Sequence, residues 1–333
     1  MPLLRAALLS EFASWDLVER LPELMASRAR VCSANPMPSR LLNGTDHVVI
    51  APTGASLYSA LMIAEMARSV SSVPVVISRG FDVPSWVGSR TLYIAVSKSG
   101  RDEELIYSLA AAGDQGAKCI VISGGSSSGS HLHEMACAQG YPEYSLTEEE
   151  DHPVLEIAGT FAALWCAISV LARWSVTELE TIEPILTSQR DLMSDGSENN
   201  PANLIAGVLK GKTSHFYGST GICSAASEVW SYLLHRATGK PAFHDSFPGV
   251  DEGPDLVNFG LEMPTDAVLL LLRDSADDPL VRERIDRWIT AATAGSLRGR
   301  LHEIIAEGAT PIERLWSTVH LGMWTACWSA TMT

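Results

Sequence analysis

The sequence predicts an α/β fold in which two doubly wound parallel sheets are flanked by helices. At 333 residues, the chain is long enough for two domains of average size. Short apolar segments alternate with longer helical segments, a pattern typical of parallel strands joined by helices. The pattern occurs in both halves of the chain and so indicates an internal duplication. Ligands of such sheets lie beyond the carboxyl ends of the strands, or at the junction of the two halves.

The first domain is predicted over residues 41–185, after an N-terminal helical segment at 1–40. Aliphatic runs predict its strands, at residues 46–52, 73–80, 91–97 and 117–125. Mixed polar and apolar residues at helical spacing predict its helices, at residues 53–70, 107–116 and 130–140.

Residues 152–174 form a long apolar segment that could be mistaken for a membrane span. Glu156 interrupts it, His152-Pro153 begins it and the acidic residues 147–151 precede it. These features favour a buried helix between domains or subunits, so no membrane contact is expected.

The second domain is predicted over residues 206–333, after a polar linker at 186–205 that is rich in turn formers. Strands are expected at residues 213–219, 267–274 and 299–308. Helices are expected at residues 224–239, 279–295 and 311–330. Tryptophans at helical spacing in the last of these segments, together with Trp165 and Trp174, favour core packing over a sugar-stacking surface.

Composition excludes several classes of protein. With 46% hydrophobic and 19% charged residues, the chain can bury a large core. Its formal net charge of -15 disfavours binding to nucleic acid. The N-terminal residues lack the pattern of a signal peptide. The six cysteines are scattered without a CxxC pair, which predicts buried free thiols in a reducing cytoplasm and no metal site.

Two turns between a strand and a helix could bind an anion. One turn spans residues 53–59 and contains Gly54 and Ser56, and the other spans residues 97–104 and contains Ser97 and Ser99. Free backbone N–H groups, the positive helix end and the serine hydroxyls suit a phosphate, although small residues there can also simply cap the helices. Neither turn carries GxGxxG or GxxxxGK[ST], so no NAD, ATP or other cofactor is expected.

The residues around these turns resemble the sugar isomerase (SIS) superfamily and, within it, the bifunctional phosphoglucose/phosphomannose isomerases. The resemblance covers most of the chain and is carried by "VVIAPTGASLYSALM", "VPVVISRGFDVPSWVGSRTLYIAVSKSG", "GKPAF", "LLLLRDSADDPLVRERI" and "PIERLWSTVHLGMW". It implies two SIS domains, a homodimer and a ligand that is a sugar phosphate or similar molecule. It also places Ser56, Ser97 and Ser99 on the serines that hold phosphate in the family.

Other positions depart from the family pattern. The family's S-G-N-T turn reads Ser99-Gly100-Arg101-Asp102, so a carboxylate replaces a threonine hydroxyl. An ionised carboxylate about 4 Å from a dianion costs several kcal/mol in a partly dry site, unless Arg101 offsets the charge. Either Asp102 turns to solvent, or the ligand is not a simple phosphate. The family's catalytic glutamate falls on Arg236 and its ring-opening histidine on Glu252. Since an arginine cannot act as a general base, the family's isomerase mechanism is not expected.

The acidic loop predicted at residues 242–255 could supply replacement acid–base groups. Glu252 is the preferred base, with His244 or His235 as the acid, although solvated loop charges are the alternative interpretation. Asp102 and this loop both add negative charge, which favours an aminosugar derivative over a simple sugar phosphate as ligand. Two functions stay open: an enzyme with altered proton-transfer residues, and a non-catalytic SIS protein that binds or senses a carbohydrate phosphate.

Overall fold

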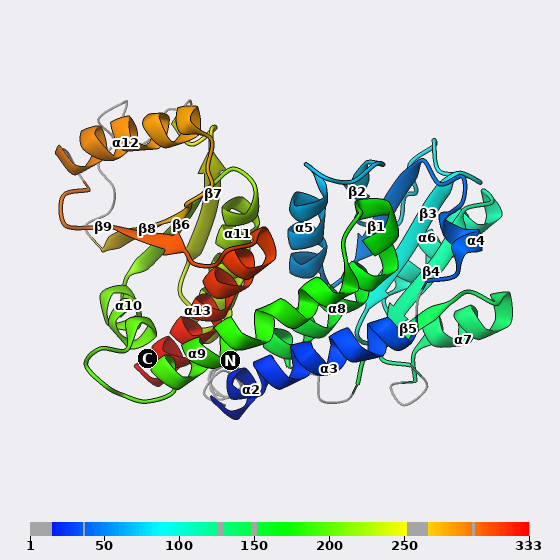
Figure 1. Cartoon of the computed structure of the whole chain (residues 1–333), viewed down its shortest axis with the longest axis horizontal. Coiled ribbons are helices and arrows are strands. Elements are labelled where there is room, and N and C mark those ends of the chain that lie inside the picture. The colour runs from blue at the N-terminus through cyan, green and yellow to red at the C-terminus, as the bar shows by residue number, and fades with distance from the viewer. Residues whose placement is uncertain are drawn as a thin grey trace. The chain divides into compact units, whose positions relative to one another are not determined.

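The computed structural model describes residues 15–35, 37–125, 129–147, 152–251, 266–294 and 297–332. The chain divides into two compact units. The N-terminal unit comprises residues 21–183, and the C-terminal unit comprises residues 184–332 together with residues 15–20. Each unit is a parallel sheet flanked by helices, as predicted (Figure 1).

The N-terminal sheet has five parallel strands in the order β2-β1-β3-β4-β5. The strands are β1 (His47–Pro52), β2 (Val75–Ile77), β3 (Thr91–Ser97), β4 (Lys118–Ser123) and β5 (Glu143–Ser145). β1 and β3 are neighbours, and their register pairs Ile50 with Ile94. All seven residues of β3 are buried, as expected for a central strand covered on both faces.

Helices cover both faces of this sheet. They are α3 (Leu21–Ala34), α4 (Ser39–Leu42), α5 (Ser56–Ala67), α6 (Glu103–Asp114), α7 (His131–Gln139), α8 (Pro153–Ala172) and the 3-10 helix η3 (Val176–Thr181). Alternate strand residues such as Val49, Tyr93 and Val121 form one core with α6 and α7. The intervening residues, among them Ile50 and Ile94, are also fully buried, so the sheet has a core on each side.

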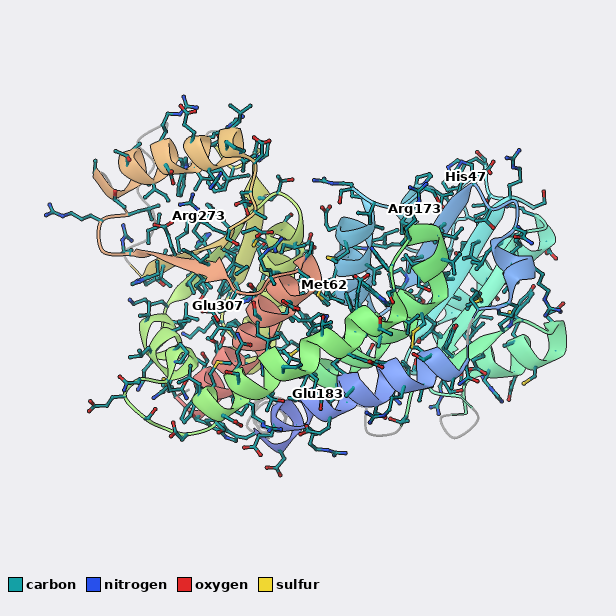
Figure 2. The ribbon with its side chains drawn as sticks, in the orientation of Figure 1. His47, Met62, Arg173, Glu183, Arg273 and Glu307 are labelled. Carbon is teal, nitrogen blue, oxygen red and sulfur yellow. A yellow bond between two sulfur atoms is a disulfide. The ribbon has the colours of Figure 1, made fainter. Side chains whose placement is uncertain are left out.

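Helix α8 is long and apolar enough, by length and composition alone, to cross a membrane. However, 89% of its most apolar window is buried inside the protein. Trp165 is fully buried and stacks on Trp174 with ring centroids 4.0 Å apart, which confirms the packing role predicted for both. The helix ends at Arg173, a residue in the left-handed conformation (φ 58°) that is labelled in Figure 2. These observations indicate a core helix.

The C-terminal sheet has four parallel strands in the order β7-β6-β8-β9. The strands are β6 (Thr213–Ser219), β7 (Ala242–Phe247), β8 (Ala267–Asp274) and β9 (Leu301–Ala306). The helices of this unit are α2 (Trp15–Glu19), α9 (Ile182–Met193, which begins at the unit boundary), α10 (Pro201–Leu209), α11 (Ile222–Thr238), α12 (Pro279–Ala294) and α13 (Pro311–Thr331). The strand order matches the first four strands of the other sheet, which supports the inferred duplication.

Helix α12 covers one face of the C-terminal sheet, where Trp288 packs with Tyr217 and Phe247. In the same unit α11 packs against α13, and Trp230 Nε1 donates a hydrogen bond to the Thr318 carbonyl at 2.9 Å. The α13 tryptophans at 316 and 324 are fully buried, which confirms that they pack in the core.

An ion-pair network joins three elements of the C-terminal unit. Arg273, at the end of β8 and labelled in Figure 2, lies 2.8 Å from both Asp286 on α12 and Glu303 on β9. Burial opposes the charged form of this guanidinium, but the two carboxylates raise its pKa above the ordinary value. The network therefore keeps a charged residue at the edge of the core.

The secondary structure differs from the sequence-based expectations in three places. Residues 242–247, expected as the start of a loop, form the edge strand β7, and the short edge strand β5 was not foreseen. The linker expected at 186–205 is largely helical, because Leu186 and Met193 are buried at helical spacing. The division between compact units falls between residues 183 and 184.

The cysteines also differ from the prediction of six buried free thiols. Cys32 on α3 and Cys166 on α8 form a disulfide within the N-terminal unit. Cys137 is free but exposed, whereas Cys119, Cys223 and Cys327 are free and buried. The prediction failed because scattered spacing in the sequence does not reveal which residues two packed helices bring together.

Candidate functional site

The two serine-containing turns follow adjacent strands, β1 and β3, so they lie at the same edge of the N-terminal sheet. We call the group of Thr53, Gly54, Ser56, Ser97 and Ser99 the serine cradle. Ser56 begins α5 and Ser97 ends β3, and both side chains are buried, whereas Ser99 is exposed. Gly54 adopts φ +61°, a left-handed conformation that favours glycine.

The Asp102 carboxylate accepts hydrogen bonds from three hydroxyl groups of this cradle. Its Oδ2 accepts hydrogen bonds from Thr53 at 3.0 Å and from Ser99 at 3.1 Å, and it also accepts a bond from Ser97. The backbone N–H of Gly100 in turn donates to Ser97 Oγ at 2.9 Å. Asp102 stands at the N-cap position of α6, yet its side chain does not cap that helix. The carboxylate therefore faces the cradle.

Glu156, on α8, accepts hydrogen bonds from Ser56, the remaining serine of the cradle. Its Oε1 accepts the backbone N–H of Ser56 at 3.0 Å and the Ser56 hydroxyl at 2.9 Å, and Thr160 Oγ1 lies 3.4 Å from the same hydroxyl. Burial raises the pKa of Glu156, although the Ser56 hydrogen bonds and the charge of Lys98 act to lower it. The negative charge of Asp102 adds to the rise.

The basic residues beside the cradle bind other groups. Arg101 is exposed, and its Nε donates to the carbonyl of Gly129 at 3.3 Å. Lys98 Nζ donates to the carbonyl of Thr147 at 2.6 Å, while its charge still favours ionised Glu156. Asp102 accepts its hydrogen bonds from hydroxyl groups and not from the neighbouring guanidinium.

The cradle thus presents two acids where a phosphate would need donors. A hydroxyl has one proton, and a hydroxyl that donates it to a carboxylate cannot donate it to a phosphate oxygen. A dianion would also meet two carboxylates at close range, at a cost of several kcal/mol in a partly buried site. In its present form, the arrangement suits a cationic or neutral hydrogen-bond donor better than an anion.

The histidines proposed for acid–base chemistry lie in the C-terminal unit. His235 is exposed near the end of α11, and its Nδ1 is 2.8 Å from the carbonyl of Lys240. Arg236 follows it on the same helix. His244 is exposed on β7, opposite Phe216 in the register of the sheet. Among the residues the structure describes, no hydrogen bond joins the two histidines.

The acidic residues of the predicted loop have mixed outcomes. Glu252, the preferred base, lies outside the described residues. Asp251 forms an ion pair with Arg284 on α12 and accepts the backbone N–H of Gly249 at 3.2 Å. Burial opposes ionisation of Asp251, but these partners lower its pKa below the ordinary value. Asp251 is therefore held as a structural carboxylate.

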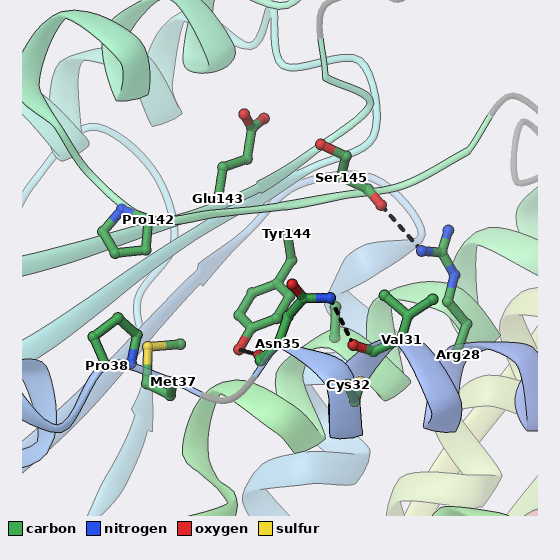
Figure 3. A pocket seen from close by; sticks show the side chains of 11 residues that line it. Arg28, Val31, Cys32, Asn35, Met37, Pro38, Pro142, Glu143, Tyr144 and Ser145 are labelled. Atoms are coloured by element: carbon green, nitrogen blue, oxygen red, sulfur yellow. Dashed lines mark hydrogen bonds between the residues drawn. The ribbon is translucent and has the colours of Figure 1, made fainter.

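A separate cavity of about 380 Å³ lies at the β5 edge of the N-terminal unit. It is lined by residues of α3 and of the segment that follows it, by residues 142–145, and by Ala163 on α8 (Figure 3); the first group is Arg28, Val31, Cys32, Asn35, Met37 and Pro38. Arg28 donates to the Ser145 carbonyl at 3.0 Å and Tyr144 donates to the Asn35 carbonyl at 3.4 Å, so its polar groups bind one another. None of the cradle residues lines this cavity.

Thr53, Glu156 and Lys98 were not predicted as site residues. An acid inside the apolar segment 152–174 was a usable signal for Glu156, because a buried carboxylate needs partners. No signal in the sequence identified the partner, since Ser56 lies 100 residues away.

Comparisons with known proteins agree with the fold. Residues 198–333 match the family described as the bacterial phospho-glucose isomerase C-terminal SIS domain. The bifunctional phosphoglucose/phosphomannose isomerase of Caldicellulosiruptor bescii is 24% identical over 295 residues, which cover 86% of this chain and 84% of that protein.

Solved structures of low sequence identity share the fold. The C-terminal domain of glucosamine-fructose-6-phosphate aminotransferase from Francisella tularensis matches with a TM-score of 0.70 at 13% identity, over 95% of each chain. Tagatose-6-phosphate ketose/aldose isomerase from Escherichia coli matches with a TM-score of 0.69 at 14% identity, over 96% of this chain and 92% of that chain. The match to this SIS domain over residues 198–333 and the relative of 24% identity show that the chain resembles phosphosugar isomerases of the SIS superfamily, and the solved structures show that it shares their fold.

Proposed function

We propose that the protein binds a small carbohydrate derivative at the serine cradle, and that Asp102 and Glu156 select a ligand with an amino group over a simple sugar phosphate. The observation that carries the proposal is the set of hydroxyl groups that donate to Asp102 Oδ2. An ammonium group has three donors and no acceptor, so its hydrogen bonds and charge complement carboxylates.

The proposal includes two SIS domains, a homodimer and a cytoplasmic location. The matching strand orders of the two sheets support a second SIS domain besides the one matched at residues 198–333. The dimer and the location rest on the resemblance to the phosphoglucose/phosphomannose isomerases. Light scattering of the purified chain tests the dimer directly.

Binding measurements test the ligand class. Isothermal titration with glucosamine, glucose, glucose-6-phosphate and glucosamine-6-phosphate should give an affinity for glucosamine at least tenfold above that for glucose, and no gain from the 6-phosphate. Asp102→Asn keeps the shape and one acceptor but removes the charge, so it should abolish the preference for the amine and improve binding of the phosphates about tenfold, or about 1.4 kcal/mol.

Asp46→Asn is the matched control, because it removes one charge from the amino end of β1, where Asp46 pairs with Arg90. It should leave the selectivity unchanged. If glucose-6-phosphate binds the unaltered protein more tightly than glucosamine, and Asp102→Asn does not change this order, the proposal is wrong.

Proton transfer on the bound carbohydrate would require a base, for which Glu252 stays our candidate, with His244 or His235 as the acid. Turnover of fructose-, glucose- and mannose-6-phosphate and of their amino analogues, compared with Glu252→Gln, tests this role. At least a hundredfold loss of turnover in that variant is expected.

A second candidate is a binding or sensor protein without catalysis. It is favoured by the structural contacts of two side chains: His235, a proposed acid, bonds to the Lys240 carbonyl, and Asp251, in the acidic loop, pairs with Arg284. Ligand binding without turnover of any of these sugars would select this candidate.

A further inference from the structure

Helix α7 carries a histidine and an exposed cysteine one turn apart. His133 and Cys137 are four residues apart, so they share one face of the helix. The Sγ atom of Cys137 lies 3.7 Å from Nε2 of His133, within the range of a hydrogen bond to sulfur. Cys137 is exposed, so a reagent in solution can reach the thiol.

Glu143, on the adjacent edge strand β5, holds the other side of the imidazole. Its Oε2 lies 2.6 Å from His133 Nδ1, and its side chain is only 12% exposed. Figure 3 shows the Glu143 side chain pointing to the opposite side of the strand from Tyr144. The carboxylate fixes the tautomer of the neutral imidazole, because Nδ1–H donates a hydrogen bond to Glu143. Nε2 then has a free lone pair and can accept a hydrogen bond from the Cys137 thiol.

The carboxylate itself is anchored. Ser123, at the end of β4, donates to Glu143 Oε1 at 2.6 Å. Ser123 Oγ accepts from Ser130 at 3.2 Å and from the backbone N–H of Gly125 at 3.1 Å. Within the part of the chain that the structure describes, Glu143 from β5 and Cys137 from the same helix are the titratable groups bonded to the imidazole, and Ser123 of β4 contributes a neutral hydroxyl.

The geometry is that of a nucleophile, a general base and an orienting acid. The cysteine and the glutamate lie on opposite nitrogens of the ring, so the three side chains do not converge on a common point. Accordingly, within the described ranges, no group of three or more His, Cys, Asp or Glu side chains is arranged to hold a metal ion.

The other free thiols of the chain lack these features. Burial raises the pKa of Cys119 to about 11 and that of Cys327 to about 12, and it also raises the pKa of Cys223. Buried protonated thiols are poor nucleophiles. They therefore serve as internal references for Cys137 in the same molecule.

We propose that His133, oriented by Glu143, activates the Cys137 thiol, and that Cys137 is a site of thiol–disulfide exchange with low-molecular-weight disulfides. The thiol proton moves to His133 Nε2. The Cys137 sulfur attacks one sulfur of the disulfide, a new S–S bond forms, and the old S–S bond breaks. The released thiolate takes up a proton from the imidazolium or from water, and no other oxidant is required.

The rate of reaction with 4,4′-dithiodipyridine, followed by absorbance on the full chain from pH 5.5 to 9, tests the proposal. An ordinary thiol has a pKa near 8.5 and loses about tenfold in rate for each pH unit below it. At pH 6, Cys137 should react at least tenfold faster than N-acetylcysteine. Mass spectrometry and Cys137→Ser should assign the fast phase to this residue.

Variants distinguish activation of Cys137 by His133 and Glu143 from a reactivity that depends only on the exposure of the thiol. His133→Gln and Glu143→Gln should each lower the rate at pH 6 at least fivefold, with little change at pH 9. Glu134→Gln is the matched control, since it removes an exposed acid from the same helix and should leave the profile unchanged. The proposal is overturned if the unaltered protein follows the profile of N-acetylcysteine, a comparison that does not depend on whether any variant folds.

Discussion

At the scale of single residues, Asp102 shows how one carboxylate sets the hydrogen bonding of a turn. Ser97 ends β3, and its hydroxyl donates to the Asp102 carboxylate within the same turn. The Ser56 hydroxyl likewise donates a hydrogen bond to the Glu156 carboxylate. Both carboxylates act as internal acceptors for donors that suit a phosphate.

His320 is a second residue whose environment decides its chemistry. It is fully buried on α13, its Nε2 accepts from Trp324 Nε1 at 2.9 Å, and its Nδ1 therefore donates to Gln189 Oε1 at 3.0 Å. Burial lowers the pKa of His320 to about 3, and the charge of Arg190 acts in the same direction. The folded protein thus keeps this histidine neutral.

We expect this histidine to make stability depend on pH. The unfolded chain binds its proton below about pH 6.5 and the folded chain only near pH 3, so the free energy of unfolding falls as the pH drops through this window. Between pH 7 and pH 5 His320 should contribute a loss of about 2 kcal/mol, and His320→Gln should remove this contribution. Urea unfolding at both pH values measures it.

His131→Gln, which alters an exposed histidine on α7, is the control and should keep the full pH dependence. An equal change between the two pH values in the His320→Gln variant and the unaltered protein would contradict the assignment.

At the scale of elements, close packing between strand and helix fixes the C-terminal unit. Gly218 lies in β6 just before the turn into α11, and a Cβ atom there would lie 2.1 Å from the carbonyl oxygen of Cys223. Since that neighbour is backbone, it cannot move aside cheaply. Gly218 therefore allows the helix to approach the strand.

We expect Gly218→Ala to destabilise the protein by about 1–3 kcal/mol, because the helix and strand must separate. Gly207→Ala on α10 is the matched control, since no atom lies within 4 Å of its Cβ position. That change should be neutral or stabilising by up to about 1 kcal/mol, because alanine favours helices. Thermal unfolding compares the two, and similar effects would argue against the packing role.

The elements themselves were largely predictable from the sequence. Central strands such as β3 and β8 are largely apolar segments, and Pro311 indicated the start of α13. The edge strands β7 and β5 were missed, because β7 carries polar residues and lies half in solvent, and β5 spans three residues.

At the scale of the whole molecule, a disulfide closes a long loop of the chain. Cys32 and Cys166 are separated by 134 residues and link α3 to α8 within the N-terminal unit. A cross-link over so long a loop restricts the unfolded chain and stabilises a fold by about 2–5 kcal/mol. The prediction of six free thiols, which missed this disulfide, was the main error of the sequence-based description.

We expect thiol titration of the denatured, unreduced chain to find four thiols, and six after reduction. Cys32→Ser should lower the free energy of unfolding by about 2–5 kcal/mol, whereas Cys137→Ser, which changes an exposed free thiol, should not. Six thiols before reduction would show that Cys32 and Cys166 are not bonded.

The sequence by itself determined the α/β class, the strand–turn–helix plan, the SIS resemblance and the placement of the cradle serines. These features depend on local periodicity and on motifs contained within short segments. Only the tertiary structure decided that Glu156 binds Ser56, that Asp102 faces the cradle and that His133 lies between Cys137 and Glu143. Such contacts depend on how helices pack on the sheet, which local sequence patterns do not encode.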